Sequence, residues 1–382
     1  MRIASLLPSA TEMVCAVGAR DELVGVSHEC DFPHGVERLP ILTRPRKALP
    51  RASGAIDRAV REILEDALAV YEIELERLES VRPDVVVTQD LCDVCAVSLD
   101  DVRAALSKLA REDVAIVNTR PGRLADVWDD VRRIGAALGR EEEGERVARE
   151  LAARCEAIGE RARAWLERSG ERRPRVLTIE WLDPVMVGGT WMPELVELAG
   201  GEALVTEPGE HAPTLRLDEL RDLDPDVVLV KPCGFDLERT TSELDLLRTN
   251  LPWTEWRAVR EGRVVVADGN AYFNRPGPRL VESLEILAAA VLGPAFEEFR
   301  PKHAGAAFRL APTSPAAPSR PTEPGSIDQD RAGSARSWSI EPGSVRLESA
   351  SRAREGRWAG RAARCSALVL VDRTRFGRAG RA

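Results

Sequence analysis

The sequence predicts an α/β fold of two Rossmann-like lobes with parallel sheets, joined by a long rigid helix. Short β-branched runs alternate with helical segments through residues 1–300, a pattern typical of parallel sheets covered by helices. The chain also repeats itself. The stretch VRPDVVVTQDLCDVC (81–95) matches LDPDVVLVKPCGFDL (223–237), and TEMVCAVGARDELVGV (11–26) resembles PELVELAGGEALV (193–205). Two copies of one architecture follow from this repeat.

In the first copy, strands are predicted at residues 2–7, 22–27, 84–89 and 114–119, where β-branched residues cluster. A helix is predicted to begin near Ser9, because Ser9 and Glu12 have the spacing of a capping box. Gly18 is predicted to end that helix. We therefore assign residues 1–122 to an N-terminal lobe.

A helical connection is predicted over residues 123–173. Its pattern is helical throughout, with interruptions expected at Gly139 and Gly144. A second part of about 27 residues would span about 40 Å at 1.5 Å per residue. A stiff helix of this length would restrict hinge motion between the lobes.

The second lobe is predicted at residues 174–300, with strands at 175–181, 226–232 and 263–269. From residue 301 the chain becomes rich in Pro, Ser, Ala and Arg, without a periodic apolar face. We expect this segment, 301–382, to be a disordered basic tail, since it cannot offset its ordering entropy. It holds 15 basic against 7 acidic residues.

The remainder of the chain has 39 basic and 56 acidic residues, which argues against nucleic acid as a partner. No apolar run is long enough for a membrane helix, and Pro8 and Glu12 interrupt the apolar start, so no secretory signal is read. The seven scattered cysteines are typical of a reduced compartment. The expected location is the cytoplasm, or the periplasm or cell surface if the true start lies elsewhere.

In parallel α/β lobes, ligands bind beyond the carboxyl ends of the strands. The segments that leave those ends are PSAT, SHECDFP, QDLCDVC, EWLDP, KPCGFD and DGNAYFNRPGP. They contain Trp181, Tyr272 and Phe273, and a cleft lined by these residues and Trp191 would suit a large, flat and partly apolar ligand. Burial in a lobe core is an equally good interpretation of any one of these aromatic residues.

Cys92 and Cys95 allow three interpretations: a metal site completed by His28 and Cys30, a redox pair, or pocket lining. No second CxxC pair is present, and neighbouring aspartates would raise the thiol pKa values. We favour pocket lining. No nucleophile elbow or phosphate-binding glycine loop is found, so an enzyme is not expected. The alternative is a metal-dependent enzyme that uses those four residues.

The stretches SLLPSATEMVCAVGA, LVGVSHECDFP, PDVVVTQ, GGTWMPELVELAGG and DGNAYFNRPGPRLVE resemble the cobalamin-binding proteins of ABC importers. These belong to the helical-backbone metal-receptor class, which also binds iron–siderophore complexes and haem. The resemblance covers about residues 1–295, and the SHECDFP and QDLCDVCAVS stretches are similar to a cobalamin-binding subgroup. Exported members carry a signal peptide or lipid-attachment cysteine, and they have an aromatic residue where this chain has SHEC.

The resemblance implies the class III substrate-binding architecture, with one cobalamin or related corrinoid held between the lobes of a monomer. The residues it places at the ligand are Ser9, Thr11, His28, Cys92, Trp181, Trp191, Tyr272 and Phe273. His28 is a candidate axial ligand of cobalt, and a hydrogen-bonded loop histidine is the alternative interpretation of this residue. For docking on an ABC permease, the nearest acidic matches are Asp100 or Asp101 on the first lobe and Asp236 or Glu238 on the second. Haem or a ferric siderophore is the alternative ligand.

Overall fold

A computed structural model describes residues 1–65, 70–89, 99–109, 111 and 113–312, all within one compact unit. Within them, the first sheet has the strand order β2-β1-β5-β6, and every pairing is parallel. Its strands are β1 (Ile3–Ser5), β2 (Leu23–Val26), β5 (Val85–Gln89) and β6 (Ala115–Thr119). The four strands predicted for this lobe are confirmed.

The second sheet has the order β12-β11-β10-β7-β8, with β9 paired to β7. Its strands are β7 (Arg175–Leu182), β8 (Val185–Val187), β9 (Glu202–Ala203), β10 (Val227–Val230), β11 (Val264–Ala267) and β12 (Ala307–Arg309). The three predicted strands form its parallel centre. The sheet is mixed rather than purely parallel, because β8 and β12 pair antiparallel to β7 and β11.

The internal repeat is visible in atomic detail at the two Pro-Asp pairs. Asp84 comes just before β5, and its carboxylate accepts the backbone N–H of Arg2 at 2.7 Å, just before β1. Asp226 comes just before β10 and accepts the N–H of Arg175, at the start of β7, at 2.8 Å. Each aspartate thus fixes the register of the parallel strand beside it.

The first helix, α1 (Pro8–Ala16), does not begin with the predicted capping box. Leu7 is the N-cap, Pro8 occupies the first helical position, and no side chain caps the helix. The Glu12 carboxylate is bound instead by arginines of the second lobe. The predicted end of the helix is confirmed, since Gly18 follows it with a left-handed φ of 80°.

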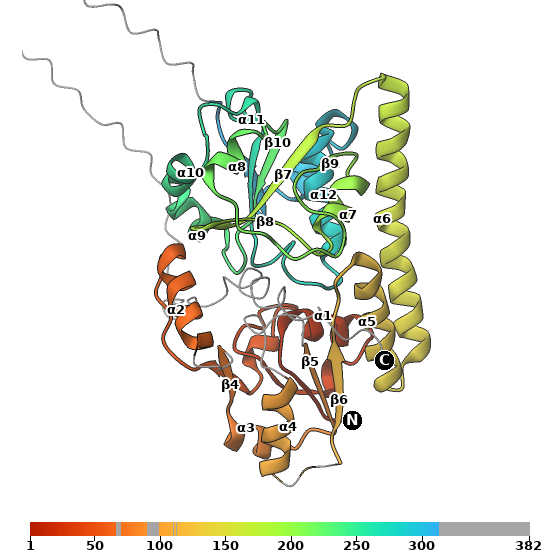
Figure 1. The fold of residues 1–382 in the computed structure, drawn as a ribbon. Helices are drawn as coiled ribbons and strands as arrows, with labels where there is room; N and C mark the ends of the chain where they lie inside the picture. The colour runs from red at the N-terminus through yellow and green to blue at the C-terminus, as the bar shows by residue number, and fades with distance from the viewer. Residues whose placement is uncertain (66–69, 90–98, 110, 112, 313–382) are drawn as a thin grey trace, which may run out of the picture. The chain divides into compact units, whose positions relative to one another are not determined.

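Two short antiparallel strands, β3 (Thr43–Pro45) and β4 (Tyr71–Ile73), were not predicted. Between them lies α2 (Ser53–Glu65), which extends toward the second lobe (Figure 1). The lobe is completed by α3 (Leu75–Val81), α4 (Leu99–Lys108) and the short helices η1 (Arg20–Glu22) and η2 (Val36–Arg38).

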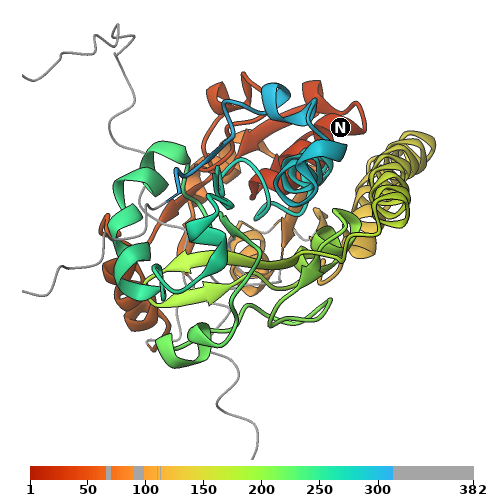
Figure 2. The same cartoon turned by 90° about the horizontal axis from the view of Figure 1, so that it is seen from above.

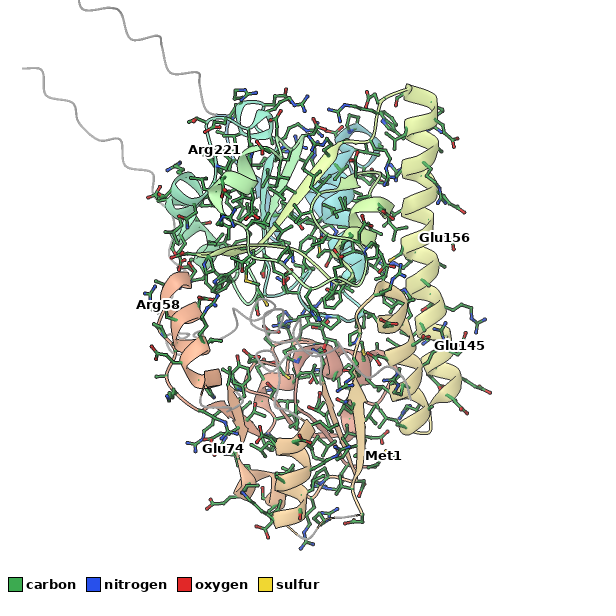
Figure 3. All side chains as sticks on the ribbon, in the orientation of Figure 1. Met1, Arg58, Glu74, Glu145, Glu156 and Arg221 are labelled. Carbon is green, nitrogen blue, oxygen red and sulfur yellow. The ribbon has the colours of Figure 1, made fainter. Side chains whose placement is uncertain are left out.

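The connection consists of α5 (Leu124–Ala137) and the 29-residue helix α6 (Glu141–Ser169). The expected break at Gly139 is found, but Gly144 lies inside α6. Its role is close packing, because a Cβ added at Gly135 of α5 would lie 2.8 Å from the Cα of Gly144. Figure 3 shows Glu145 and Glu156 on the side of α6 that faces away from the sheets.

The second lobe is covered by helices on both faces of its sheet, as Figures 1 and 2 show. They are α7 (Met192–Leu198), α8 (Leu217–Arg221), α9 (Leu237–Ser242), α10 (Leu244–Asn250), α11 (Arg257–Arg260) and α12 (Leu280–Val291), followed by η3 (Gly293–Ala295) and α13 (Phe299–Lys302). The apolar helix α12 packs against α6 and α7.

The predicted boundary at residue 300 is too early, because residues 301–312 belong to the folded second lobe. Strand β12 extends the sheet, and Glu285 of α12 binds the Lys302 ammonium at 2.6 Å and His303 Nε2 at 2.7 Å. These two ion pairs anchor a segment whose composition alone gives no apolar periodicity. The rest of the predicted tail lies outside the described residues.

Candidate functional site

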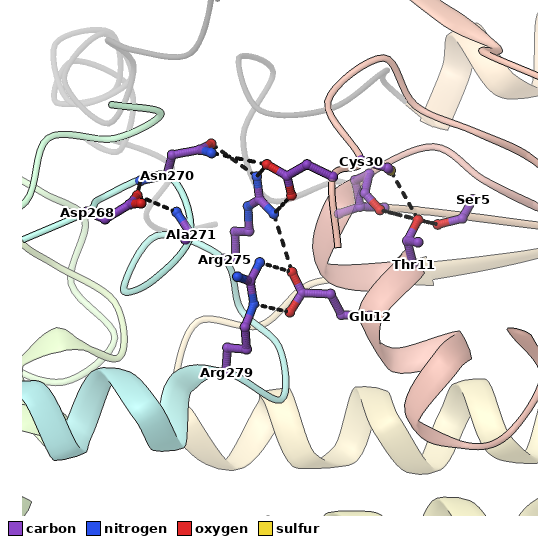
Figure 4. Close-up of polar contacts among 11 residues, drawn as sticks. Ser5, Thr11, Glu12, Cys30, Asp268, Asn270, Ala271, Arg275 and Arg279 are labelled. Atoms are coloured by element: carbon purple, nitrogen blue, oxygen red, sulfur yellow. Dashed lines mark hydrogen bonds and ion pairs between the residues drawn. The ribbon is translucent and has the colours of Figure 1, made fainter. Parts of the chain in front are cut away.

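Loops from the two sheets meet at a buried arginine, Arg275, in the loop after β11. Its guanidinium binds the Asp31 carboxylate at 2.5 and 3.0 Å, and Asp31 lies in the loop after β2. The same guanidinium lies 3.4 Å from Glu12 of α1 and donates to Asn270 at 3.0 Å (Figure 4). Arg275 and Glu12 are 3% and 2% exposed, so their charges are compensated by each other and by Asp31 rather than by water.

A second arginine strengthens this contact. Arg279 binds both oxygens of Glu12, with Nε at 2.9 Å and Nη2 at 2.5 Å. Its guanidinium also stacks over the ring of Phe32, at 4.3 Å, and lies 5.5 Å from the ring centre of Tyr272. This bidentate pair links the two lobes with fixed geometry.

On the first lobe, hydroxyls hold the loop after β2 against α1. Thr11 Oγ1 donates to Ser5 Oγ at 2.8 Å and contacts the buried Cys30 sulfur at 3.1 Å. Cys30 therefore packs beneath the loop, directly beside Asp31.

On the second lobe, Asp268 and Lys231 shape the facing loop. Asp268 Oδ1 accepts the N–H groups of Asn270 and Ala271 at 2.9 and 2.7 Å, and its burial raises the pKa of the carboxyl. The buried Lys231 ammonium binds Glu180 at 2.6 Å and Asn274 at 2.7 Å. The loop that carries Arg275 is thus held at both ends.

Helix α2 makes a second contact between the lobes. The backbone N–H of Ser53 donates to both oxygens of Glu243, at 3.3 and 3.1 Å. A side chain at Gly54 would collide with the Asp183 carboxylate, so the glycine permits this close approach. The apolar face of α2 shares a hydrophobic core with Trp181 and Phe235 of the second lobe.

His28 lies half-buried in the loop after β2. Its Nδ1 lies 2.7 Å from Thr43 Oγ1, and its ring meets Tyr71 edge-on at 4.9 Å. These contacts orient the imidazole. Contact with a metal stays a prediction.

Three of the four aromatic residues predicted at the ligand lie in hydrophobic cores. Trp181 packs edge-on against Phe235 at 5.0 Å, and Trp191 Nε1 donates to the Phe273 carbonyl at 2.8 Å. Phe273 is fully buried, with a left-handed φ of 64°. Tyr272 alone is half-buried, beside Arg279. The burial of Trp181, Trp191 and Phe273 agrees with the interpretation that these side chains belong to the lobe cores.

The remaining predicted residues are divided between interior and surface. Ser9 and Thr11 are buried in α1, and Ser9 lies against Gly277 of the second lobe. Asp100 and Glu238 are exposed, as docking residues must be. Their alternatives are partly engaged, since Asp101 pairs with Arg46 and Asp236 caps α9. Cys92 and Cys95 lie outside the described residues.

The interlobe residues Glu12, Asp31, Asn270, Arg275 and Arg279 were not predicted. A signal was present: Glu12 is the one charge in the apolar stretch 3–19, and a charge in a buried helix needs a partner. Another missed residue is Gln89, at the carboxyl end of β5. It is 4% exposed, and its Oε1 has no hydrogen-bond partner in the described structure.

Two α/β lobes joined by a helical connection, with loops from their carboxyl edges in contact, define a substrate-binding protein of class III architecture. The chain belongs to the periplasmic binding protein family, which matches residues 3–271. The members of this family are substrate-binding proteins of ABC transporters and not enzymes, so the metal-enzyme alternative is wrong. Within the described residues, no group of three or more His, Cys, Asp or Glu side chains could hold a metal ion.

Two curated relatives illustrate the similarity. A vitamin B12-binding protein of Vibrio parahaemolyticus is 21% identical over 294 residues, covering 74% of this chain and 86% of its own. An uncharacterized ABC transporter substrate-binding lipoprotein of Bacillus subtilis is 21% identical over 304 residues, covering 78% and 82%. The names of the family and of this lipoprotein do not support the predicted cytoplasmic location.

Solved structures share the fold. A periplasmic haem-binding protein from Pseudomonas aeruginosa superposes with a TM-score of 0.58 at 20% identity, covering 81% of this chain and 95% of its own. The periplasmic vitamin B12-binding protein of Vibrio cholerae gives 0.54 at 19% identity, covering 77% and 97%. No helix in the described part of this chain is long and apolar enough to cross a membrane.

Proposed function

We propose that the protein binds cobalamin or a related corrinoid between its lobes, as the substrate-binding component of an ABC importer. One observation carries this proposal. The stretches SHECDFP (27–33) and DGNAYFNRPGP (268–278), which carry the resemblance to cobalamin-binding proteins, contact each other directly. Asp31 of the first binds Arg275 and Asn270 of the second. Motifs more than 230 residues apart in sequence therefore meet in one contact between the lobes.

The names of curated relatives support a corrinoid over haem. Those from Vibrio and Yersinia are named vitamin B12-binding proteins, and each match covers more than 70% of this chain. The haem-binding proteins share the fold at similar TM-scores, which does not discriminate between ligands.

Tyr272 is the half-buried aromatic residue beside the interlobe arginines. Its ring offers a flat surface on which a corrin ring could pack. A tyrosine is also a known ligand of ferric haem, so this residue is compatible with either ligand.

The proposal assigns the following roles to the predicted residues. His28 and Tyr272 would contact the ligand, with His28 approaching cobalt, while Trp181, Trp191 and Phe273 would support the loops from the cores. Ser9, Thr11 and Cys92 would line the site. Asp100 and Glu238 would dock on the permease. Exchange of both for lysine should abolish transport in reconstituted vesicles while leaving ligand affinity unchanged.

We place this capture outside the cytoplasm, where the matched family and the lipoprotein relative are named to act. Fractionation of cells that express the gene from its genomic start measures this directly. Recovery of all the protein in the cytoplasm would remove the importer role and leave a corrinoid carrier.

The decisive experiment is calorimetric titration of the purified full chain with cyanocobalamin, cobinamide and haemin, with visible absorbance recorded in parallel. We expect one-to-one corrinoid binding in the nanomolar to low micromolar range. His28→Ala should shift the cobalt band and weaken binding, whereas His211→Ala, an exposed histidine of the second lobe, should not. Haemin binding without corrinoid binding would overturn the proposal, and an unchanged spectrum in His28→Ala would remove the axial role.

A further inference from the structure

The second lobe contains a cavity of about 350 Å³ at the edge of its sheet opposite the interlobe loops. Pro174 and Arg263, which line it, directly precede β7 and β11. The loops with Lys231 and Asn270 follow β10 and β11 at their other ends. The cavity is therefore separate from the site described above, and its volume is in the range of small-molecule pockets.

Three arginines line this cavity: Arg263, Arg300 and Arg309. Arg263 Nη2 donates to the Val291 carbonyl at 3.0 Å, and Arg309 Nη2 to the Ala290 carbonyl at 3.4 Å. Arg300 lies 4.0 Å from Glu297. Each guanidinium carries five N–H donors, so these contacts use a small part of the available donors.

The three charges are close enough to act on one another. Partial burial lowers the pKa of Arg309, and the positive charges of Arg300 and Arg263 lower it further. Glu171 also lines the cavity, which leaves an excess of two positive charges among its lining residues. Elsewhere in the described structure, clustered arginines such as Arg275 and Arg279 share a carboxylate.

Capping of a helix explains part of this cluster. Helix α12 ends at Val291, and cations near a helix C-terminus bind its last carbonyls and stabilise its dipole. Arg263 and Arg309 do this. Capping does not account for Arg300, whose guanidinium donates no hydrogen bond in the described structure, or for the open volume between the three side chains.

The rest of the wall is apolar and partly flat. Trp165, near the end of α6, lines the cavity together with Pro174, Leu292 and Pro294. An indole and two pyrrolidine rings provide stacking surface, and the guanidiniums provide planar donors suited to phosphate oxygens. The cavity thus pairs an anion-binding side with an apolar side.

We propose that this cavity binds a small phosphate monoester whose organic part is flat and apolar, with the phosphate on Arg263, Arg300 and Arg309 and the organic part on Trp165. The dianionic phosphate matches the excess of two positive charges. The phosphate monoester group is found in soluble esters and in phosphatidic acid at a membrane surface. The site is independent of corrinoid binding.

The test is calorimetric titration of the full chain with phenyl phosphate at low ionic strength, beside inorganic phosphate and neutral benzyl alcohol. We expect one phenyl phosphate per chain, weaker binding of inorganic phosphate, and no binding of benzyl alcohol. Arg300→Gln should reduce the affinity for phenyl phosphate about tenfold, as expected for loss of one charged donor. Trp165→Leu should reduce it to that of inorganic phosphate.

Arg248→Gln is the matched control, because Arg248 is an exposed arginine of α10 paired with Asp245. Equal affinities in wild type and Arg300→Gln, equal losses in Arg300→Gln and Arg248→Gln, or no binding would each overturn the proposal. Sedimentation with phosphatidylcholine vesicles that contain phosphatidic acid, lost in Arg300→Gln, would assign the phosphate to a lipid headgroup. Phenyl phosphate binding without vesicle sedimentation would assign it to a soluble ester. Arg300→Gln should keep its corrinoid affinity, which separates this result from the proposed function.

Discussion

Glu12 is a buried carboxylate whose partners come from the other lobe. Arg275 and Arg279 both bind it, and Asp31 balances the second positive charge. Such a cluster contributes little net stability compared with apolar packing, but removal of one member leaves a buried charge uncompensated. Its main effect is therefore to fix which loops of the two lobes face each other.

We expect Glu12→Gln to lower the free energy of unfolding by about 3 kcal/mol, because two arginines lose their shared anion. Urea unfolding followed by circular dichroism measures this. Glu156→Gln, on the exposed face of α6, is the control and should change stability by less than about 0.5 kcal/mol. Equal stabilities of the two variants would show that water compensates the arginines.

Asp130 is a second buried carboxyl, on α5. It is 1% exposed, and one oxygen binds Arg133 at 2.9 Å while the other has no partner among the described atoms. Burial raises its pKa from 3.8 to about 7, against the opposing charge of Arg133. Between these values the folded chain holds a proton that the unfolded chain has lost. The stability contributed by the neutral carboxyl is therefore complete below about pH 4 and is lost as the pH rises to about 7.

Asp130→Asn keeps the neutral form at every pH. We expect this variant to be more stable than wild type at pH 7.5 by about 2 kcal/mol and equal to it near pH 4. Thermal unfolding across this range measures the difference. Asp129→Asn, at an exposed neighbouring position, should show no such pH dependence. A constant difference across the range would contradict the raised pKa.

At the scale of elements, the connection between the lobes consists of two helices, α5 and α6. Their close packing depends on two glycines. Gly135 and Gly144 bring the backbones of α5 and α6 together, and a Cβ at Gly135 would also lie 2.9 Å from the Arg140 carbonyl. Backbone atoms cannot rotate away as side chains do. The angle between the two helices is set at this point.

Gly135→Ala should destabilise the fold by about 1–3 kcal/mol through overpacking, although alanine normally favours a helix. Chemical denaturation of the variant measures the change. Gly305→Ala introduces the same methyl group where no atom lies within 4 Å, and it should be nearly neutral. A stabilised Gly135→Ala variant would mean that α5 and α6 separate without cost.

At the scale of the whole molecule, two elements besides the interlobe loops link the lobes. Helix α6 packs on α5, which itself contacts α1 and β6 of the first lobe, and on α7 and α12 of the second lobe. Helix α2 contacts Glu243 and the core around Trp181. Since α2 is attached to the first lobe through β3 and β4, its contacts must break for the lobes to separate.

Glu243→Gln removes the negative charge that accepts the Ser53 N–H at the N-terminus of α2. We expect hydrogen exchange of the amides of Ser53–Glu65 to become about fivefold faster, which corresponds to about 1 kcal/mol of helix-terminus stabilisation. Exchange read by mass spectrometry measures this. Asp245→Asn, at an exposed position of α10, should leave α2 unchanged. Unchanged exchange in Glu243→Gln would show that apolar packing alone holds α2.

The sequence predicted the seven central strands because each lies in a short apolar run, and most of these runs are rich in β-branched residues and buried, although β6 is only partly buried. It missed β3, β4, β8, β9 and β12, which have two or three residues each, too short for a period to be recognised. It also missed the folded segment 301–312, which depends on Glu285 and on pairing with β11. Pairing with a strand elsewhere in the chain leaves no recognisable pattern in the sequence of the segment itself.

The candidate site was predicted by segment but not by side chain. The loops after β2 and β11 were chosen because strand ends converge in a parallel sheet, which is a property of topology. Which residues of those loops face the other lobe depends on backbone turns such as the left-handed Phe273, and no spacing rule contains them. For Trp181, Trp191 and Phe273 the sequence therefore left contact with the ligand and burial in a lobe core as equal interpretations, and all three side chains are buried.

By itself, the sequence determined the two-copy α/β architecture, the helical connection and the loops at which the copies meet, because burial and periodicity are local properties of a chain. Only the tertiary structure decided the charge pairing of Glu12, Asp31 and Arg275 and the contact of α2 with the second lobe. It also decided the cavity that Arg263, Arg300 and Arg309 line at the edge of the second sheet. These features join residues that are far apart in the chain, and their energies depend on distance and desolvation, which exist only once the chain has folded.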